Sequence, residues 1–325
     1  MNESELLELR REKWRCSGNA ASTVDEARAF VESVGFCLMY PVRPAQLVPT
    51  FIGAFTGSDE NLPVSKQAYA DPRAKDATEV MVRLLRRQFA YEVNDYFDSN
   101  FLVSAAAFPY FYGLVGDRSP KSAPKLGPAS GYSPLAVHAF LIIHKQGPVT
   151  KNKLREELGG DLSEAALDRA LGELWSRLRI TRVDYNPEEG AYWDVLYRWA
   201  PDAVREGLAV SMPAAMTALI SKYLEGVVAA EPLEIEEFFS NFVSRSRTRE
   251  AINALLAARE LQYVTVSGKT MLEVTPPRVA AAPVVYAGYT PRNRRQPIAN
   301  RPGRRSIAKP AVKPAAPDTP DKESL

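Results

Sequence analysis

Three arginines alternate with small residues in one short segment: Arg245, Arg247 and Arg249. The segment lies where a turn enters a predicted helix, and the exposed amides at a helix N-terminus favour bound phosphate. Arginine also pairs bidentately with guanine. We therefore expect these arginines to contact DNA. The alternative is a solvated basic turn whose arginines pair with nearby glutamates: Glu234, Glu236 and Glu237.

Two further groups of cations are candidates for phosphate contacts. Lys269 follows the Ser267-Gly268 turn of a predicted hairpin, although one lysine at a hairpin tip also fits an ordinary solvated position. The C-terminal segment carries a second group of arginines: Arg292, Arg294, Arg295, Arg304 and Arg305. Basic arms of this kind add affinity for nucleic acid without regard to its sequence. They would equally suit an acidic protein surface.

The predicted helix that begins at Asp71-Pro72 carries charges of both signs. Its basic residues form a possible second strip with their neighbours: Lys66, Arg73, Lys75, Arg83, Arg86 and Arg87. Three carboxylates follow on the same predicted helix: Glu92, Asp95 and Asp98. Paired carboxylates can perform acid–base chemistry. We favour solvated helix surface for both sets.

The sequence offers no clear catalytic group and no metal or cofactor site. Cys16 and Cys37 are the only cysteines, too few for a disulfide framework or a cysteine-rich zinc site. His138 and His144 are the only histidines, and their separation of six does not suit a metal pair on one helix. We predict that the protein needs no cofactor, and its catalytic residues, if any exist, stay unknown at this point.

Charge is divided unevenly along the 325-residue chain, whose net charge is +2. Residues 276–325 hold ten Lys or Arg and three Asp or Glu, which leaves 31 basic and 36 acidic residues in the rest. No apolar run reaches the roughly 18–20 residues that span a bilayer, and the N-terminus lacks the features of a signal peptide. We expect a cytoplasmic protein without a membrane segment, associated with the nucleoid if it binds DNA.

Two parts of the chain repeat one order of elements. Residues 133–199 and residues 213–274 each read as three helices followed by a two-stranded hairpin, with helix caps and turn residues at the boundaries. This order is typical of the winged helix-turn-helix. The predicted fold class is mainly α with small β-hairpins (α+β), built from tandem winged helix-turn-helix modules.

The other segments are assigned from the positions of glycine and proline and from amino-acid composition. We predict an N-terminal helical extension (1–22), a helical domain (23–116) whose second helix runs from residue 71 to about Phe97, and a linker (117–132). The two winged-helix modules follow at 133–199 and 200–275. Residues 276–325 form a basic, proline-rich tail that buries too little apolar surface to order itself.

With these modules in place, the chain resembles the AlkZ/YcaQ group of bacterial winged-helix DNA glycosylases over roughly residues 24–275. The resemblance rests on short stretches of sequence: Ala27–Gly35, Phe108–Gly113, Gly147–Thr150, Leu154–Arg155 and Tyr197–Trp199. It implies a protein that acts on double-stranded DNA, linked to DNA repair.

The resemblance also implies a Gln-x-Asp motif that activates the water cleaving an N-glycosidic bond. In this chain the matching stretch is Gly35–Tyr40, with Cys37 and Met39 at the Gln and Asp positions. Neither side chain acts as a carboxylate base, and no histidine lies near Cys37 in sequence to activate its thiol. We therefore expect a DNA-binding relative without glycosylase activity.

Two alternatives stay open. The first is an active DNA glycosylase for alkylated or crosslinked bases whose catalytic groups lie elsewhere. The second is a protein-interaction scaffold, because the first module exposes acidic residues on its third helix and hairpin tip: Asp168, Glu173, Glu188 and Glu189. Acidic tips repel phosphate, which favours a protein partner at this module.

Overall fold

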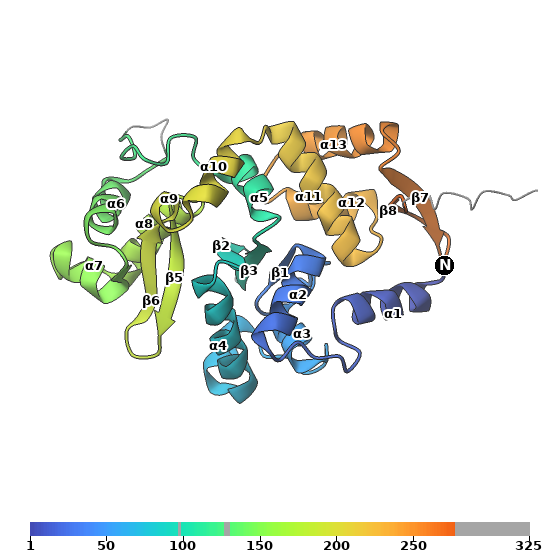
Figure 1. Ribbon diagram of the computed structural model, residues 1–325, viewed down its shortest axis with the longest axis horizontal. Coiled ribbons are helices and arrows are strands. Elements are labelled where there is room, and N and C mark those ends of the chain that lie inside the picture. The colour runs from blue at the N-terminus through green and yellow to red at the C-terminus, as the bar shows by residue number, and fades with distance from the viewer. Residues whose placement is uncertain (97–98, 127–130, 277–325) are drawn as a thin grey trace, which may run out of the picture. The chain divides into compact units, whose positions relative to one another are not determined.

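The computed structural model describes residues 1–96, 99–126 and 131–276, except for the side chains of residues 94–96. These residues form a largely helical body with small antiparallel sheets (Figure 1), so the predicted α+β class is confirmed. The basic tail arginines lie outside the described residues. The predicted segment boundaries stay predictions.

The predicted helices and hairpin of the first module are present and define what we call unit 2. Its elements are α6 (Pro134–Gln146), β4 (Val149–Thr150), α7 (Lys151–Glu157), α8 (Glu164–Trp175), β5 (Ile180–Asn186) and β6 (Gly190–Val195). Each helix begins where the sequence places a cap, because Ser133, Thr150 and Ser163 accept a hydrogen bond from a first-turn amide. Trp175 and Trp193 meet edge to face in its core.

The second predicted module has the same helices and hairpin and defines unit 3. It consists of α11 (Met212–Val227), α12 (Pro232–Phe239), α13 (Arg245–Ala257), β7 (Leu261–Val266) and β8 (Lys269–Val274). Ala230 forms an isolated antiparallel bridge with Leu272 of β8. That bridge takes the place of the short first strand seen in unit 2.

A third copy of this order, unit 1, lies before the two that the sequence revealed. It comprises α2 (Val24–Val34), β1 (Phe36–Leu38), α3 (Phe51–Thr56), α4 (Pro72–Arg86), β2 (Ala90–Tyr96) and β3 (Ser99–Ser104), with the 3-10 helix η1 (Ser65–Ala70) before α4. The prediction of a helix from residue 71 to Phe97 was wrong, since α4 ends at Arg86 and a strand follows. The sheets of units 1 and 2 share one strand order, β1-β3-β2 and β4-β6-β5.

The same backbone turn ends the third helix of every unit. Gln88, Leu178 and Arg259 each have positive φ and lie two residues before the hairpin. In unit 1 the Gln88 amide donates to Leu85 O and the Phe89 amide to Leu84 O, and units 2 and 3 repeat this pair of bonds. This is the Schellman pattern, which glycine usually fills. Because Gln88 is not glycine, the end of the helix in unit 1 carries no recognisable stop signal.

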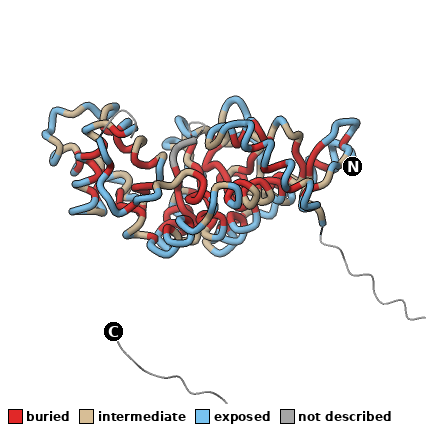
Figure 2. The backbone as a smooth tube through the Cα atoms, turned by 90° about the horizontal axis from the view of Figure 1, so that it is seen from above, coloured by how far each residue is buried: buried red, intermediate tan, exposed pale blue. Residues whose placement is uncertain are grey.

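The remaining helices connect the units. Helices α5 (Phe108–Val115), α9 (Leu196–Trp199) and α10 (Pro201–Ala209) contribute to a core shared by units 1 and 3. Helix α1 (Glu3–Lys13) packs on unit 3, where Arg10 donates to the carbonyls of Val227 and Ala229 at the end of α11. Figure 2 shows buried stretches running through all parts of the described chain.

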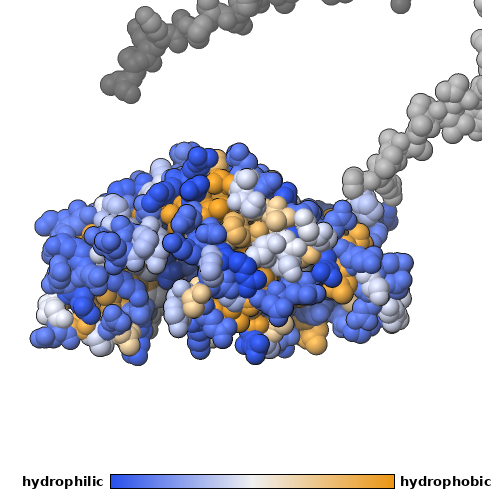
Figure 3. Space-filling view, turned by 90° about the horizontal axis from the view of Figure 1, so that it is seen from below, coloured by the Kyte–Doolittle hydropathy of each residue, from blue (hydrophilic) through white to orange (hydrophobic). Residues whose placement is uncertain are grey.

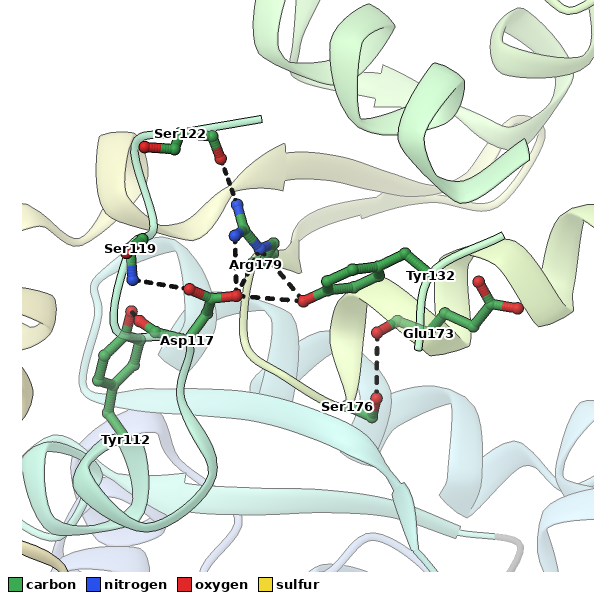
Figure 4. A network of polar contacts seen from close by, with 8 residues as sticks. All are labelled: Tyr112, Asp117, Ser119, Ser122, Tyr132, Glu173, Ser176 and Arg179. Atoms are coloured by element: carbon green, nitrogen blue, oxygen red, sulfur yellow. Dashed lines mark hydrogen bonds and ion pairs between the residues drawn. The ribbon is translucent and has the colours of Figure 1, made fainter. Parts of the chain in front are cut away.

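The start of the predicted linker is tied to unit 2 by one arginine (Figure 4). Arg179, which is almost fully buried, pairs with Asp117 at 2.8 Å and donates to the Ser122 carbonyl. Tyr132 donates to the same carboxylate, and Tyr112 of α5 donates to the Asp117 carbonyl. These bonds satisfy a buried cation and hold residues 117–122 against the unit.

No single helix of the described residues is long and apolar enough to cross a membrane, although α10 and α11, which are bent against each other, pass on length and composition when taken together.

Candidate nucleic-acid interface

The predicted basic cluster lies at the N-terminal end of α13, as expected. Arg245 and Arg247 are exposed in the first turn, which contains no acidic residue. Thr248 points inward and is fully buried, so the inward face of the helix anchors it while the arginines face out. Arg247 contacts the sulfur of Met212, the first residue of α11. Two cations therefore lie at a helix end whose amides also attract anions.

Arg249 pairs with a nearby glutamate, as in the alternative interpretation of the basic cluster. Its Nε and Nη2 donate to the two carboxylate oxygens of Glu236 at 2.7 and 2.8 Å, a bidentate pair. The guanidinium lowers the pKa of the nearly buried Glu236 carboxyl through these bonds. Arg249 therefore joins α13 to α12, and its charge is largely neutralised.

Lys269 is also engaged, although more loosely. Its ammonium lies 3.3 Å from the Glu231 carboxylate, and both side chains are partly exposed to solvent. A surface ion pair of this kind is worth about 1 kcal/mol or less, so the lysine can exchange its partner for a phosphate. The five tail arginines of the prediction lie outside the described residues.

Positions 37 and 39 are closed to solvent. Cys37 is 0% exposed and Met39 is 1% exposed, within the core between the unit 1 sheet and its helices. Burial raises the pKa of the Cys37 thiol far above its usual value, so the thiolate does not form near neutral pH. Neither side chain is exposed, although Met39 is among the residues that border the cleft described next.

A cleft of about 920 Å3 lies beside this part of the sheet. It is bounded by α4 and η1, by the unit 1 sheet and by the β5–β6 hairpin of unit 2, and its volume falls within the range of ligand pockets. Figure 3, which views the molecule from below, shows a hollow between the left part of the surface and the rest. Residues of the predicted second basic strip line it: Lys75, Arg83 and Arg86.

Several contacts hold the walls of the cleft together. Arg86 of α4 pairs with Asp184 of β5 at 2.7 Å. Thr181 and the indole of Trp175 donate to the backbone carbonyl of Glu92 at 2.8 and 3.3 Å. Side chains of unit 2 thus satisfy the outer edge of β2, which would otherwise present free carbonyls. The cleft is preformed.

Glu92 does not lie at a solvated helix end, as its position in the sequence suggested. It lies on β2, is 1% exposed, and pairs with Arg182 of unit 2 at 2.9 Å. The Arg182 guanidinium stacks over the ring of Trp175 at 4.3 Å. Asp98 and the side chain of Asp95 lie outside the described residues.

Glu92 shares one face of the sheet with positions 37 and 39. Cys37 and Glu92 are both register partners of Leu102, on the two sides of β3. The Met39 amide donates to the Asn100 carbonyl, and the Asn100 side chain donates to the Glu92 carboxylate. This grouping depends on strand pairing in a region predicted to be helical, and so it was not visible in the sequence.

Comparisons with known proteins agree with this architecture. The family model described as DNA glycosylase AlkZ-like matches residues 72–287. Among solved structures, the chain is similar to the Streptomyces sahachiroi DNA glycosylase AlkZ, at 15% identity and a TM-score of 0.55, covering 85% of this chain and 70% of that chain. At this identity the likeness shows the fold alone. No curated protein matches the chain's sequence significantly. The family match begins after Cys37 and Met39.

Proposed function

Because the chain belongs to the AlkZ-like DNA glycosylase family, we propose that it binds double-stranded DNA through the N-terminal end of α13. The observation that carries the proposal is the exposure of Arg245 and Arg247 in a first turn free of acidic residues. In a helix-turn-helix the start of the third helix enters the major groove. We interpret each unit as a winged helix, in which α13 has that position in unit 3.

Arg249 and Lys269 have supporting parts in this proposal. The Arg249–Glu236 pair fixes α13 against α12 and so sets the angle at which α13 meets the duplex. Lys269 lies next to the β7–β8 turn and adds a phosphate contact there. The tail arginines add binding that depends on salt and not on sequence. The protein is then nucleoid-associated.

We also propose that positions 37 and 39 carry out no hydrolysis. A buried thiol and a buried thioether offer no lone pair that could take a proton from water at neutral pH. The protein would recognise DNA without breaking its N-glycosidic bonds there.

The test is the duplex affinity of the full chain at several salt concentrations. The double variant Arg245→Ala/Arg247→Ala should bind more weakly at low salt, and its slope of log affinity against log salt should fall by about one per arginine. Arg155→Ala is the matched control, because Arg155 is a partly exposed arginine on α7 of unit 2. A slope that stays unchanged in the double variant would contradict the assignment.

A second candidate function is glycosylase activity through a different carboxylate. Glu92 favours it, because it lies on the same sheet face as positions 37 and 39 and is held by an amide side chain, that of Asn100. Against it stands the burial of Glu92 behind Arg182. Release of an alkylated base by the native protein, abolished in Glu92→Gln, would establish this candidate. No release from alkylated or crosslinked DNA would remove it.

A protein partner at unit 2 is the remaining proposal. Glu188 and Glu189 lie at the tip of the β5–β6 hairpin and keep it acidic. Asp168 of α8, by contrast, is paired with Lys151. Failure of the protein to bind any DNA would make this the leading function.

A further inference from the structure

We propose that Arg10 of α1 is a positioning residue that holds a strained turn at Val228 and thereby fixes the β7–β8 hairpin of unit 3. Helix α1 lies outside the three repeated units, and its contacts with unit 3 lie at the end of α11 and at the hairpin. The hold on the turn does not depend on the proposed function. Only its consequence for duplex binding rests on that proposal.

The turn at Val228 is unusual for its residue type. Val228 ends α11 with φ 70° and ψ −58°, and the Ala229 amide donates to the Val227 carbonyl at 2.9 Å. These angles and this bond define a γ-turn with positive φ, which is rare and strained. A β-branched residue with positive φ is an outlier, because its Cβ lies too close to the backbone. Such a conformation persists only where the surrounding structure holds it.

Arg10 bridges the two carbonyls on either side of this turn. Its Nε donates to the Val227 carbonyl at 2.9 Å, and its Nη2 donates to the Ala229 carbonyl at 2.6 Å. The planar guanidinium keeps its donors at a fixed separation, so it also sets the separation of the two carbonyl oxygens. The contact therefore fixes the backbone on both sides of Val228 at once.

The end of α11 has no cation of its own. Its last turn contains no basic residue and contains Glu225, although a helix C-terminus favours positive charge. Arg10 supplies that charge from α1, and the indole of Trp14 donates to the Gly226 carbonyl at 2.8 Å. Two of the last carbonyls of α11 therefore accept hydrogen bonds from α1.

The turn directs the chain into the hairpin. Ala230, two residues after Val228, pairs through its amide and its carbonyl with Leu272 of β8 at 3.0 and 2.8 Å. The next residue, Glu231, carries the carboxylate that pairs with Lys269 beside the hairpin turn. The conformation at Val228 therefore sets where the hairpin lies on unit 3 and where Lys269 is placed.

Helix α1 also contacts the hairpin directly. Leu6 is 2% exposed and packs with Val266 and Met271 of the hairpin. The Glu3 amide donates to the Ser267 hydroxyl at 3.0 Å, so α1 reaches the β7–β8 turn (Figure 1). One helix thus joins the end of α11 to the far end of the hairpin, and loss of its hold on the turn should loosen the hairpin.

Hydrogen exchange of the full chain, read by mass spectrometry over residues 261–274, tests the proposal. The variant Arg10→Met keeps most of the apolar stem and removes the donors. It should speed exchange of the hairpin amides by about tenfold, because the turn and the hairpin open together. Arg11→Met is the matched control, since Arg11 is the next residue of α1 and pairs with Asp59, outside unit 3, at 3.2 Å. Its loss should change hairpin exchange by about twofold or less.

Substitution at Val228 gives the specific readout. Glycine adopts positive φ without strain, so Arg10→Met in a Val228→Gly background should speed exchange by only about threefold or less. A contact that merely attaches α1 to unit 3 would lose the same amount in both backgrounds. Three results would overturn the proposal: unchanged hairpin exchange in Arg10→Met, equal acceleration in Arg11→Met, or an acceleration of undiminished size in the Val228→Gly background.

Duplex affinity separates this proposal from the proposed function. If unit 3 binds the duplex, Arg10→Met should weaken binding, and the addition of Val228→Gly should restore part of it. Loss without rescue would overturn the positioning role, because a lost phosphate contact is not recovered by a change at residue 228. A native protein that binds no duplex would contradict the proposed function alone, and hydrogen exchange would still decide the role of Arg10.

Discussion

Helices α4 and α13 are the third helices of units 1 and 3, yet their surroundings differ. The β5–β6 hairpin of unit 2 lies against α4, and Arg86 is tied to that hairpin through Asp184. No neighbouring unit covers the N-terminal end of α13 among the described residues, and Arg245 and Arg247 stay exposed there. One repeated position thus borders a cleft in unit 1 and an open basic surface in unit 3.

The difference shows that a repeated fold does not fix the function of its parts. The neighbouring unit decides whether a third helix is covered by protein, as α4 is, or left open, as the N-terminal end of α13 is. In unit 1 the contacts of Glu92 with unit 2 hold the hairpin in place and so create the cleft. Variants that remove the contacts between units 1 and 2 test whether these charges stabilise the fold. Variants at the N-terminal end of α13 test whether its charges bind DNA.

The largest effect is expected at the pair between units 1 and 2. Arg182→Ala leaves the Glu92 carboxylate, which is 1% exposed, without its guanidinium partner. Removing one member of a buried pair costs about 3 kcal/mol or more. Urea denaturation should show this loss, whereas Arg245→Ala should leave stability within about 0.5 kcal/mol of the native protein. Equal stability of the two variants would show that the Arg182–Glu92 pair does not stabilise the fold more than the exposed Arg245 does.

The second effect is expected at Arg249. Its removal leaves Glu236, whose side chain is mostly buried, without a bidentate partner, and should lower the free energy of unfolding by less than Arg182→Ala does, because the arginine itself is largely exposed. Arg249 lowers the pKa of Glu236, so the pair stabilises the fold above the ordinary glutamate pKa. The contribution is lost as pH falls through the lowered value.

Thermal or urea unfolding as a function of pH checks this second prediction. The stability difference between the native protein and Arg249→Ala should be present near neutral pH and disappear in acid. A difference that persists after Glu236 is protonated would show that Arg249 acts through packing rather than through its charge.

A smaller effect is expected for Arg86→Ala. The Arg86–Asp184 pair is partly exposed, so its loss should cost about 0.5 kcal/mol. Duplex affinity should stay within about twofold of the native protein, because Arg86 lies on α4 and not at the proposed contact on α13. A large loss of duplex affinity without loss of stability would place Arg86 in direct contact with DNA.

The smallest effect is expected for duplex binding in Lys75→Ala/Arg83→Ala. If the duplex binds at α13, removing these α4 cations should change duplex affinity by about twofold or less at moderate salt. Fluorescence anisotropy with a fully paired duplex measures it. A drop as large as that of the α13 double variant would show that both third helices contact the duplex.

Units 2 and 3 could be predicted because helices in both begin at recognisable caps, such as Ser133 in unit 2 and Ser211 in unit 3. The hairpin of unit 1 was not predicted, because the end of α4 was not recognised. Apolar residues continue at helical spacing across Arg87 and Gln88. The left-handed turn is made by Gln88, a residue type that does not predict such a turn. Strand β2 was consequently assigned to a helix.

The candidate sites divide in the same way. The α13 cluster was visible because its arginines are close together in sequence, although the Arg249–Glu236 pair was one of several open possibilities. The cleft was not visible in the sequence, since its walls come from η1, α4 and the β5–β6 hairpin, which border one space only through the packing of unit 2 on unit 1. Part of its lining lies on β2 and β3, which were not predicted from the sequence.

The most direct test of the central claim is the duplex affinity of residues 1–277, which form a compact unit by themselves, at two salt concentrations. We predict that this fragment binds duplex DNA and that its affinity falls steeply with salt, because Arg245 and Arg247 belong to the folded part. Full-chain binding that disappears once residues 278–325 are removed would contradict the claim and assign the affinity to the tail alone.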